Sequence, residues 1–170
     1  MDGKGQYLTA AVIVVLVGVM AFFGLRAPVF PNVTVAVDAT ETITVEQMRG
    51  TRRKLVLALV IPGDPVSAQA VELLRAQHAA HDAQAAFAAL IFTDPASAET
   101  FRQSKDLPFA LYSISPQSNP VQYNELVKTV GGWRSRFYGG TVVLLDANRK
   151  VSAQVDGIEL EHLDDLIKKL

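Results

Sequence analysis

The sequence predicts an α/β domain with a mixed central sheet, preceded by a single membrane-spanning helix. Three observations support this. Leu55 to Ile61 is an unbroken apolar run, too short for a stable helix and typical of a strand covered on both faces. Further apolar strand patterns then alternate with helical patterns along the chain. Leu8 to Leu25, by contrast, is almost entirely apolar.

The apolar segment near the N-terminus is long enough to cross a bilayer. Lys4 and Arg26 enclose 21 residues without a charge, and at ~1.5 Å per residue these span a hydrocarbon core of about 30 Å. A cleaved signal peptide and a buried core helix are the alternatives. The segment is longer than the apolar part of a typical signal, and Pro28 would follow a cut after Ala27. We therefore expect residues 1–26 to be a short tail and a retained inner-membrane anchor.

The orientation of this anchor follows from its short N-terminal tail. The flanking charges, Lys4 with the amino terminus against Arg26, nearly balance. A tail this short commonly stays in the cytoplasm, so we expect the domain to be periplasmic. The lipid bilayer is then a partner through residues 8–25.

The composition excludes several kinds of chemistry. The 170 residues include no cysteine, so no disulfide, thiolate metal site or cysteine nucleophile can form within them. The formal net charge of −1 leaves no basic footprint for nucleic acid. No cofactor motif is visible, and we expect no cofactor, no nucleic-acid partner and one globular domain.

Residues 27–40 read as a linker followed by a possible edge strand. Prolines stiffen the start of this stretch, and valines alternate with small residues from Val33 to Val37. The domain proper is expected over residues 41–170. Thr44 and Gln47 have the spacing of a capping box, which predicts a short helix after Thr44.

The central strand is followed by signals for a turn and a helix. Pro62-Gly63 breaks the strand, Asp64 offers a carboxylate cap, and Pro65 suits a first helical turn. Helical spacing of apolar residues then continues to about Asp82. A buried strand therefore leads through a tight turn into a helix that packs back on the sheet.

The rest of the chain repeats these signals. Strands are predicted at Phe87 to Thr93 and Pro108 to Ile114, with Asp94-Pro95 capping the helix between them. A helix follows around Tyr123 to Val130. The remaining predicted elements are a hairpin with strands Thr141 to Leu145 and Val151 to Val155, and a last helix from Leu160 to Leu170.

This order of elements resembles the thioredoxin-like fold, in the branch of peroxiredoxins and membrane-anchored thiol reductases. The resemblance implies a three-layer α/β/α domain with a mixed sheet. Residues 62–65 correspond to the family's Cys-x-x-Cys, and Gly139-Gly140-Thr141 stands where members carry a cis-proline. Aligned to a peroxiredoxin, Ser67 takes the place of the peroxidatic cysteine. The degenerate active-site positions are Pro62, Gly63, Asp64, Pro65, Ser67 and Gly140.

None of these positions supplies the thiolate that the family's redox chemistry needs. Other readings of the polar residues have little support. His78 and His81 could share a metal, but no third ligand is apparent, and we interpret both as packing residues. Ser67 lacks a Gly-x-Ser-x-Gly elbow, and Asp64 is better explained as a cap than as a catalytic carboxylate. We therefore predict no enzyme.

The stretch from Gly131 to Gly140 has the most unusual composition in the chain. It combines the single tryptophan with arginines and further aromatics, residue types enriched at protein–protein hot spots. The alternatives are a surface for lipid headgroups or nucleic acid, or a purely structural cluster beneath the hairpin. The proposed partner-binding residues are Trp133, Arg134, Arg136, Phe137 and Tyr138.

Together these features predict a non-catalytic, membrane-anchored accessory or assembly subunit of a membrane protein complex. The complex could be energy-transducing, respiratory or photosynthetic, and its other subunits would be the partners. One alternative is a thioredoxin-fold, redox-linked chaperone or maturation factor of the periplasm that uses no thiol of its own. Another is a free-standing anchored module that presents partners or metal in the periplasm.

Overall fold

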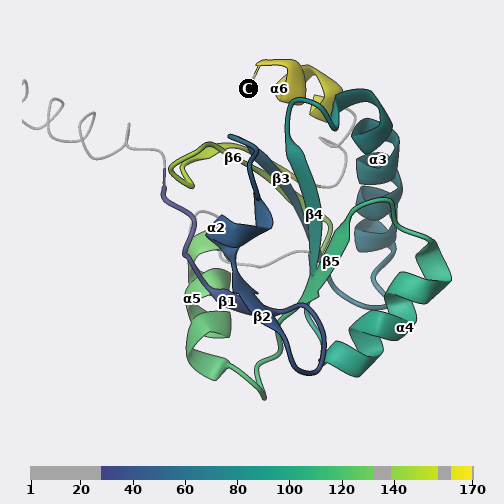
Figure 1. Cartoon of the computed structure of the whole chain (residues 1–170), viewed down its shortest axis with the longest axis vertical. Coiled ribbons are helices and arrows are strands. Elements are labelled where there is room, and N and C mark those ends of the chain that lie inside the picture. Colours follow the sequence, from purple (N-terminus) through teal and green to yellow (C-terminus); the bar gives the residue numbers. More distant parts are fainter. Residues whose placement is uncertain (1–27, 132–138, 157–161, 170) are drawn as a thin grey trace, which may run out of the picture.

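A mixed sheet flanked by helices forms the centre of this computed structural model, which describes residues 28–131, 139–156 and 162–169 (Figure 1). The elements are β1 (Thr34–Ala36), β2 (Thr42–Thr44), α2 (Val45–Met48), β3 (Leu55–Val60), α3 (Pro65–His81), β4 (Ala86–Ile91), α4 (Pro95–Lys105), β5 (Ala110–Ser113), α5 (Pro120–Gly131), β6 (Thr141–Leu145), β7 (Val151–Val155) and α6 (Leu163–Lys169).

Two predicted features lie outside these ranges. They are the anchor at residues 8–25 and the Trp133 to Tyr138 segment. In the described part of the chain, no helix has both the length and the apolar character needed to cross a membrane.

The strands are ordered β2-β1-β5-β4-β3-β6-β7 across the sheet. β3, β4 and β5 run parallel, whereas β6 is antiparallel to β3 and forms a hairpin with β7. The predicted mixed sheet is therefore confirmed. The strand predicted at Val33 to Val37 is confirmed as β1. Its predicted position at the edge was wrong, because β1 lies between β2 and β5. The edge is β2, which has three residues and too little pattern to be recognised from sequence.

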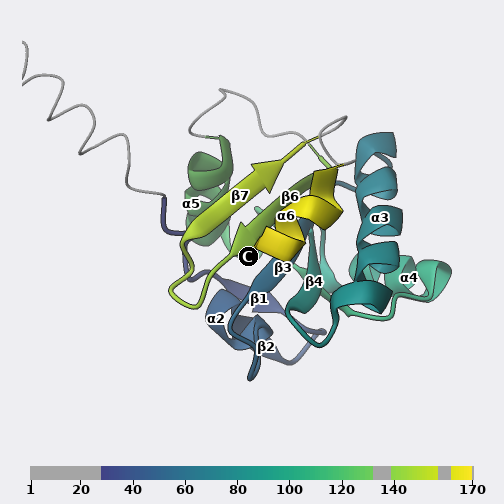
Figure 2. The same cartoon turned by 90° about the horizontal axis from the view of Figure 1, so that it is seen from above.

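β3 is buried along its whole length, as its apolar run predicts. Its side chains alternate between two cores on opposite faces of the sheet. Val56, Ala58 and Val60 face the layer that contains α3, α4 and α6. Leu55, Leu57 and Leu59 face the other core, which lies beneath α2 and α5. Figure 2 shows α5 and α3 on opposite sides of the strands.

The predicted helix starts are confirmed at the level of single hydrogen bonds. Asp64 caps α3 by accepting from the backbone N–H of Ser67 at 2.7 Å. Asp94 caps α4 in the same way. Thr44 and Gln47 form the expected capping box at α2. In each case a short polar side chain satisfies an N–H that the first helical turn leaves without a partner.

Candidate functional site

The α3 site, which we define as Pro62 to Ser67 with Gly139 and Gly140, lies where the central strand ends. After β3 the chain makes a tight turn, in which the Asp64 N–H donates to the Ile61 carbonyl at 3.2 Å. Gly63 takes a φ of 78°, a conformation that L side chains rarely adopt. The turn places the first turn of α3 directly over the end of the sheet.

Ser67 is held inside this turn and is only 1% exposed. Its Oγ accepts the Ile61 backbone N–H at 3.0 Å, and its own N–H donates to Asp64 Oδ2. The hydroxyl therefore satisfies a backbone group at the end of the strand. It is not presented to solvent as a nucleophile would be.

Gly139 and Gly140 close the α3 site from the other side. The Gly140 N–H donates to the Leu59 carbonyl at 2.9 Å, and its φ is 81°. A Cβ at Gly140 would lie 2.6 Å from the Val66 carbonyl oxygen. A Cβ at Gly139 would collide with the side chains of Ser67 and Asp64. Only glycine allows the two backbones to approach this closely.

The structure therefore brings Asp64 and Ser67 together with Gly139, and Gly140 lies against Val66 of the same helical turn. Pro62, Gly63 and Pro65 lie beside them on the exposed rim of the turn. What results is a packed junction: its carboxylate caps a helix, its hydroxyl satisfies a strand end, and glycine backbone fills the remaining space.

His78 and His81 have separate partners. The His78 ring packs edge-on against Phe87, with centroids 5.4 Å apart. His81 is buried and places Nε2 2.8 Å from Asp164 Oδ1 in α6. Their interpretation as packing residues agrees with these contacts.

The contact between His81 of α3 and Asp164 of α6 was not predicted from the sequence. Two hydrogen bonds to Asp164 lower the pKa of its carboxyl. The larger effect comes from Lys168 and the smaller from His81. The spacing of Asp164 and Lys168, one helical turn apart, is a visible signal for the local half of this cluster. Nothing in the sequence points to His81, which lies 83 residues away.

The predicted partner-binding residues Trp133, Arg134, Arg136, Phe137 and Tyr138 lie outside the described residues. The structure does describe the residues on either side of this segment. α5 ends at Gly131, and Gly139 packs on the first turn of α3. Gly139, the first described residue after this segment, therefore belongs to the α3 site.

No family model and no curated protein matches the sequence. Solved structures do resemble the fold. The thioredoxin domain of a thiol-disulfide oxidoreductase from Bacteroides vulgatus has a TM-score of 0.66 at 10% identity, over 85% of this chain and 96% of that one. A putative thiol:disulfide interchange protein DsbE from Chlorobium tepidum has a TM-score of 0.64 at 16% identity, over the same shares.

A secreted disulfide oxidoreductase from Mycobacterium tuberculosis gives a TM-score of 0.57 at 16% identity, over 82% of this chain and 96% of that one. Identities this low support a conclusion about architecture alone. The same architecture is indicated by the sheet order, by the strand-to-helix junction at the α3 site and by these three similar structures. The chain has the thioredoxin-like fold of thiol-disulfide oxidoreductases, and its 170 residues contain no cysteine.

Proposed function

We propose that this protein is a non-catalytic, membrane-anchored accessory or assembly subunit of a membrane protein complex, and that it acts by binding other subunits. The observation that carries the proposal is the packed α3 site. Ser67 is buried and bonded to the end of β3, and Gly139 and Gly140 occupy the space above it. A chain that keeps this fold without a reactive group at that junction is better suited to binding than to catalysis.

The membrane part of the proposal rests on the apolar stretch from Leu8 to Leu25. With the short N-terminal tail in the cytoplasm, the domain would lie in the periplasm. Protease added to intact spheroplasts should then digest the domain. If the domain is protected in spheroplasts and digested in inverted vesicles, the domain lies on the cytoplasmic side. The other parts of the proposal would not be affected by that result.

The docking face is proposed to be the Trp133 to Tyr138 segment, because its composition is that of an interface hot spot. Truncating a hot-spot tryptophan or arginine commonly costs about 2 kcal/mol, or roughly thirtyfold in affinity. We expect the double variant Trp133→Ala with Arg134→Ala to be lost from the complex when the native protein is purified from detergent extracts.

The thermal stability of the same double variant separates docking from packing. A variant that leaves the complex yet unfolds at the wild-type temperature supports a docking face. Normal co-purification combined with lower stability would show that these residues complete the core. The anchor helix would then be the next candidate for the contact, since apolar helices pack on partner helices as well as on lipid.

Activity assays test the non-catalytic part. The full chain should not reduce insulin or consume peroxide above the buffer rate, because neither reaction can proceed through a serine hydroxyl at this position. Turnover in a preparation free of other enzymes would overturn that part, even if the protein still co-purified with a complex.

A further inference from the structure

The start of the described chain is fastened to the turn between β6 and β7. The Phe30 N–H donates to the Arg149 carbonyl at 2.8 Å, and the Pro28 carbonyl accepts the Val151 N–H at 2.9 Å. The Phe30 side chain is fully buried. Figures 1 and 2 both show this first segment beside the hairpin. The segment is therefore held in one place on the domain.

The length of chain between this segment and the proposed anchor is short. The anchor ends at Leu25, three residues before Pro28. An extended chain covers at most ~3.6 Å per residue, which gives about 11 Å over this interval. The headgroup layer on each side of a bilayer is about 5–8 Å thick. When the anchor is inserted, the turn between β6 and β7 is therefore held close to the membrane surface.

A second segment, which leads into β3, reaches the same end of the sheet. Leu55 at the start of β3 pairs with Leu145, and Leu145 pairs with Val151 in β7. These three residues form one row across neighbouring strands, which lie about 4.8 Å apart. The backbones of Lys54 and Lys150, one residue before two of these positions, are therefore roughly 10 Å apart.

Both segments are basic, and we call residues 49–54 and 146–150 together the basic end. They hold six cationic side chains and one carboxylate, although the whole chain has a formal net charge of −1. The cations are Arg49, Arg52, Arg53, Lys54, Arg149 and Lys150, and the carboxylate is Asp146. Asp146 Oδ1 already accepts the N–H groups of Asn148 and Lys150 within the turn.

The cations of the basic end are available to a partner outside the chain. Within the described residues, none of the six forms an ion pair with a carboxylate. Arg52 and Arg149 each donate to a backbone carbonyl, which leaves their charge uncompensated. Arg53 and Lys150 are exposed. Val29, which bridges to Lys150, is apolar and 52% exposed. An exposed apolar side chain among cations suits the interfacial layer of a membrane.

We propose that the basic end binds the headgroups of anionic phospholipids in the bilayer that holds the anchor. Each lysine or arginine near an anionic membrane strengthens such binding about fivefold. This inference deepens the proposed function, on whose anchor it rests, because it fixes which end of the domain faces the membrane. The basic end precedes the start of β3 and the α3 site follows its end. The α3 site is then turned away from the bilayer, where partner subunits can reach it.

The test uses the absence of cysteine, which allows a single fluorescent label to be attached at a chosen residue. Ala147→Cys places the label in the exposed turn between β6 and β7, and Gln117→Cys places it in the exposed loop before α5. Each labelled full chain is inserted into nanodiscs that contain a small share of phosphatidylcholine with a nitroxide quencher on its headgroup. Quenching at residue 147 should exceed quenching at residue 117. It should also be stronger in phosphatidylglycerol nanodiscs than in pure phosphatidylcholine.

Charge variants locate the effect on the domain. Arg53→Gln with Lys150→Gln removes two exposed charges from the basic end and should lower the ratio of bound to detached domain roughly thirtyfold. Salt at about 1 M, where the Debye length is about 3 Å, should act in the same direction. Arg75→Gln with Arg102→Gln is the matched control. It removes two exposed charges from α3 and α4, which lie across the domain from the hairpin turn in Figures 1 and 2, and quenching should be unchanged.

Several results would overturn the inference. One is equal quenching at the two labels. Another is quenching at residue 147 that depends neither on lipid charge nor on Arg53 and Lys150, because the tether alone would then explain it. An equal loss in the control variant would assign the effect to net charge. If a single-stranded oligonucleotide binds through these two residues and anionic lipid has no effect, the basic end is a nucleic-acid site.

The same experiment separates the inference from the proposed function. Insertion into nanodiscs without any effect of lipid charge removes the inference and leaves the anchored subunit standing. A chain that does not insert would refute the anchor and the inference together. If the labels behave as expected but no complex co-purifies with the native protein, the inference stands and the role as a subunit falls.

Discussion

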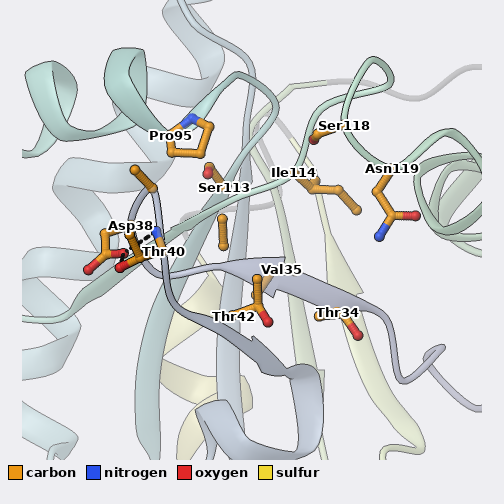
Figure 3. Close-up of a pocket in the computed structure, with 12 residues that line it drawn as sticks. Thr34, Val35, Asp38, Thr40, Thr42, Pro95, Ser113, Ile114, Ser118 and Asn119 are labelled. Carbon is orange, nitrogen blue, oxygen red and sulfur yellow. Dashed lines mark hydrogen bonds between the residues drawn. The ribbon is translucent and has the colours of Figure 1, made fainter.

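The α3 site lies at the carboxyl end of the parallel strands, and so does a cavity of about 240 Å³ between β1, the end of β5 and the starts of α4 and α5, the β1–β5 cleft (Figure 3). The α3 site is filled, whereas the β1–β5 cleft is open. β3 pairs along its length on both sides, with six register pairs to β4 and five to β6. The chain entering β6 is therefore drawn against the first turn of α3. In the described residues, β1 pairs with β5 at a single position, between Ala36 and Ser113.

Two buried serines show what this difference does. Ser67 is 1% exposed and Ser113 is 3% exposed. Ser67 accepts a backbone N–H and so helps to hold the end of a strand. Ser113 pairs in the sheet through its backbone, and its hydroxyl lines the β1–β5 cleft without a hydrogen bond to the described residues. Two serines of similar burial therefore differ in role, because one hydroxyl satisfies a backbone N–H and the other faces an open cavity.

The largest effect is expected from filling the α3 site. Gly140→Ala combines a positive φ with a Cβ 2.6 Å from the Val66 carbonyl oxygen. Because backbone cannot move aside cheaply, we expect the free energy of unfolding to fall by about 3 kcal/mol. Urea denaturation of the full chain measures this change.

Gly63→Ala is the matched control for that change. Its φ of 78° is equally unfavourable, but a Cβ there meets nothing within 4 Å. The cost should therefore be about 1 kcal/mol, from backbone strain alone. Equal losses in the two variants would show that contact between the glycines and α3 does not hold the site closed.

A smaller effect should distinguish the two serines. Ser67→Ala leaves the Ile61 N–H without an acceptor and should cost about 1.5 kcal/mol. Ser113→Ala removes a hydroxyl that has no described partner and should leave stability unchanged or slightly raised. Ser104→Ala, at an exposed serine whose hydroxyl donates to the Phe101 carbonyl, serves as the control and should change little. A loss at Ser113 as large as at Ser67 would contradict the comparison.

The smallest effect concerns the opposite end of α3. The lowered pKa of Asp164 means that its carboxylate stabilises the fold above the unfolded-state pKa of about 4, and that this contribution is lost as the pH falls through the lower folded value. Asp164→Asn should therefore be less stable than wild type at pH 7, with the difference shrinking below about pH 4.

Asp165→Asn, at the exposed neighbouring residue, controls for the loss of one charge in α6. Thermal unfolding of both variants across this pH range checks the prediction. A difference that persists unchanged in strong acid would mean that packing, and not the charge of Asp164, is responsible.

The sequence by itself determined the parts of the fold that depend on neighbours in the chain. The apolar run of β3, the caps at Asp64 and Asp94, and the capping box after Thr44 all involve residues within one or two helical turns. Hydrophobic burial and N–H satisfaction act locally there, so the pattern is sufficient. The resemblance also assigned Gly140 to the degenerate active-site positions, together with residues 62–65.

Only the tertiary structure decided the contacts that join distant segments. β1 was predicted to be an edge strand because the residues of a single strand do not show which other strands pair with it. The glycine contacts at Val66, the bond from His81 to Asp164 and the open space beside Ser113 likewise arise when separate elements pack. Each depends on distances that sheet pairing sets across the chain, and residue type alone does not encode them.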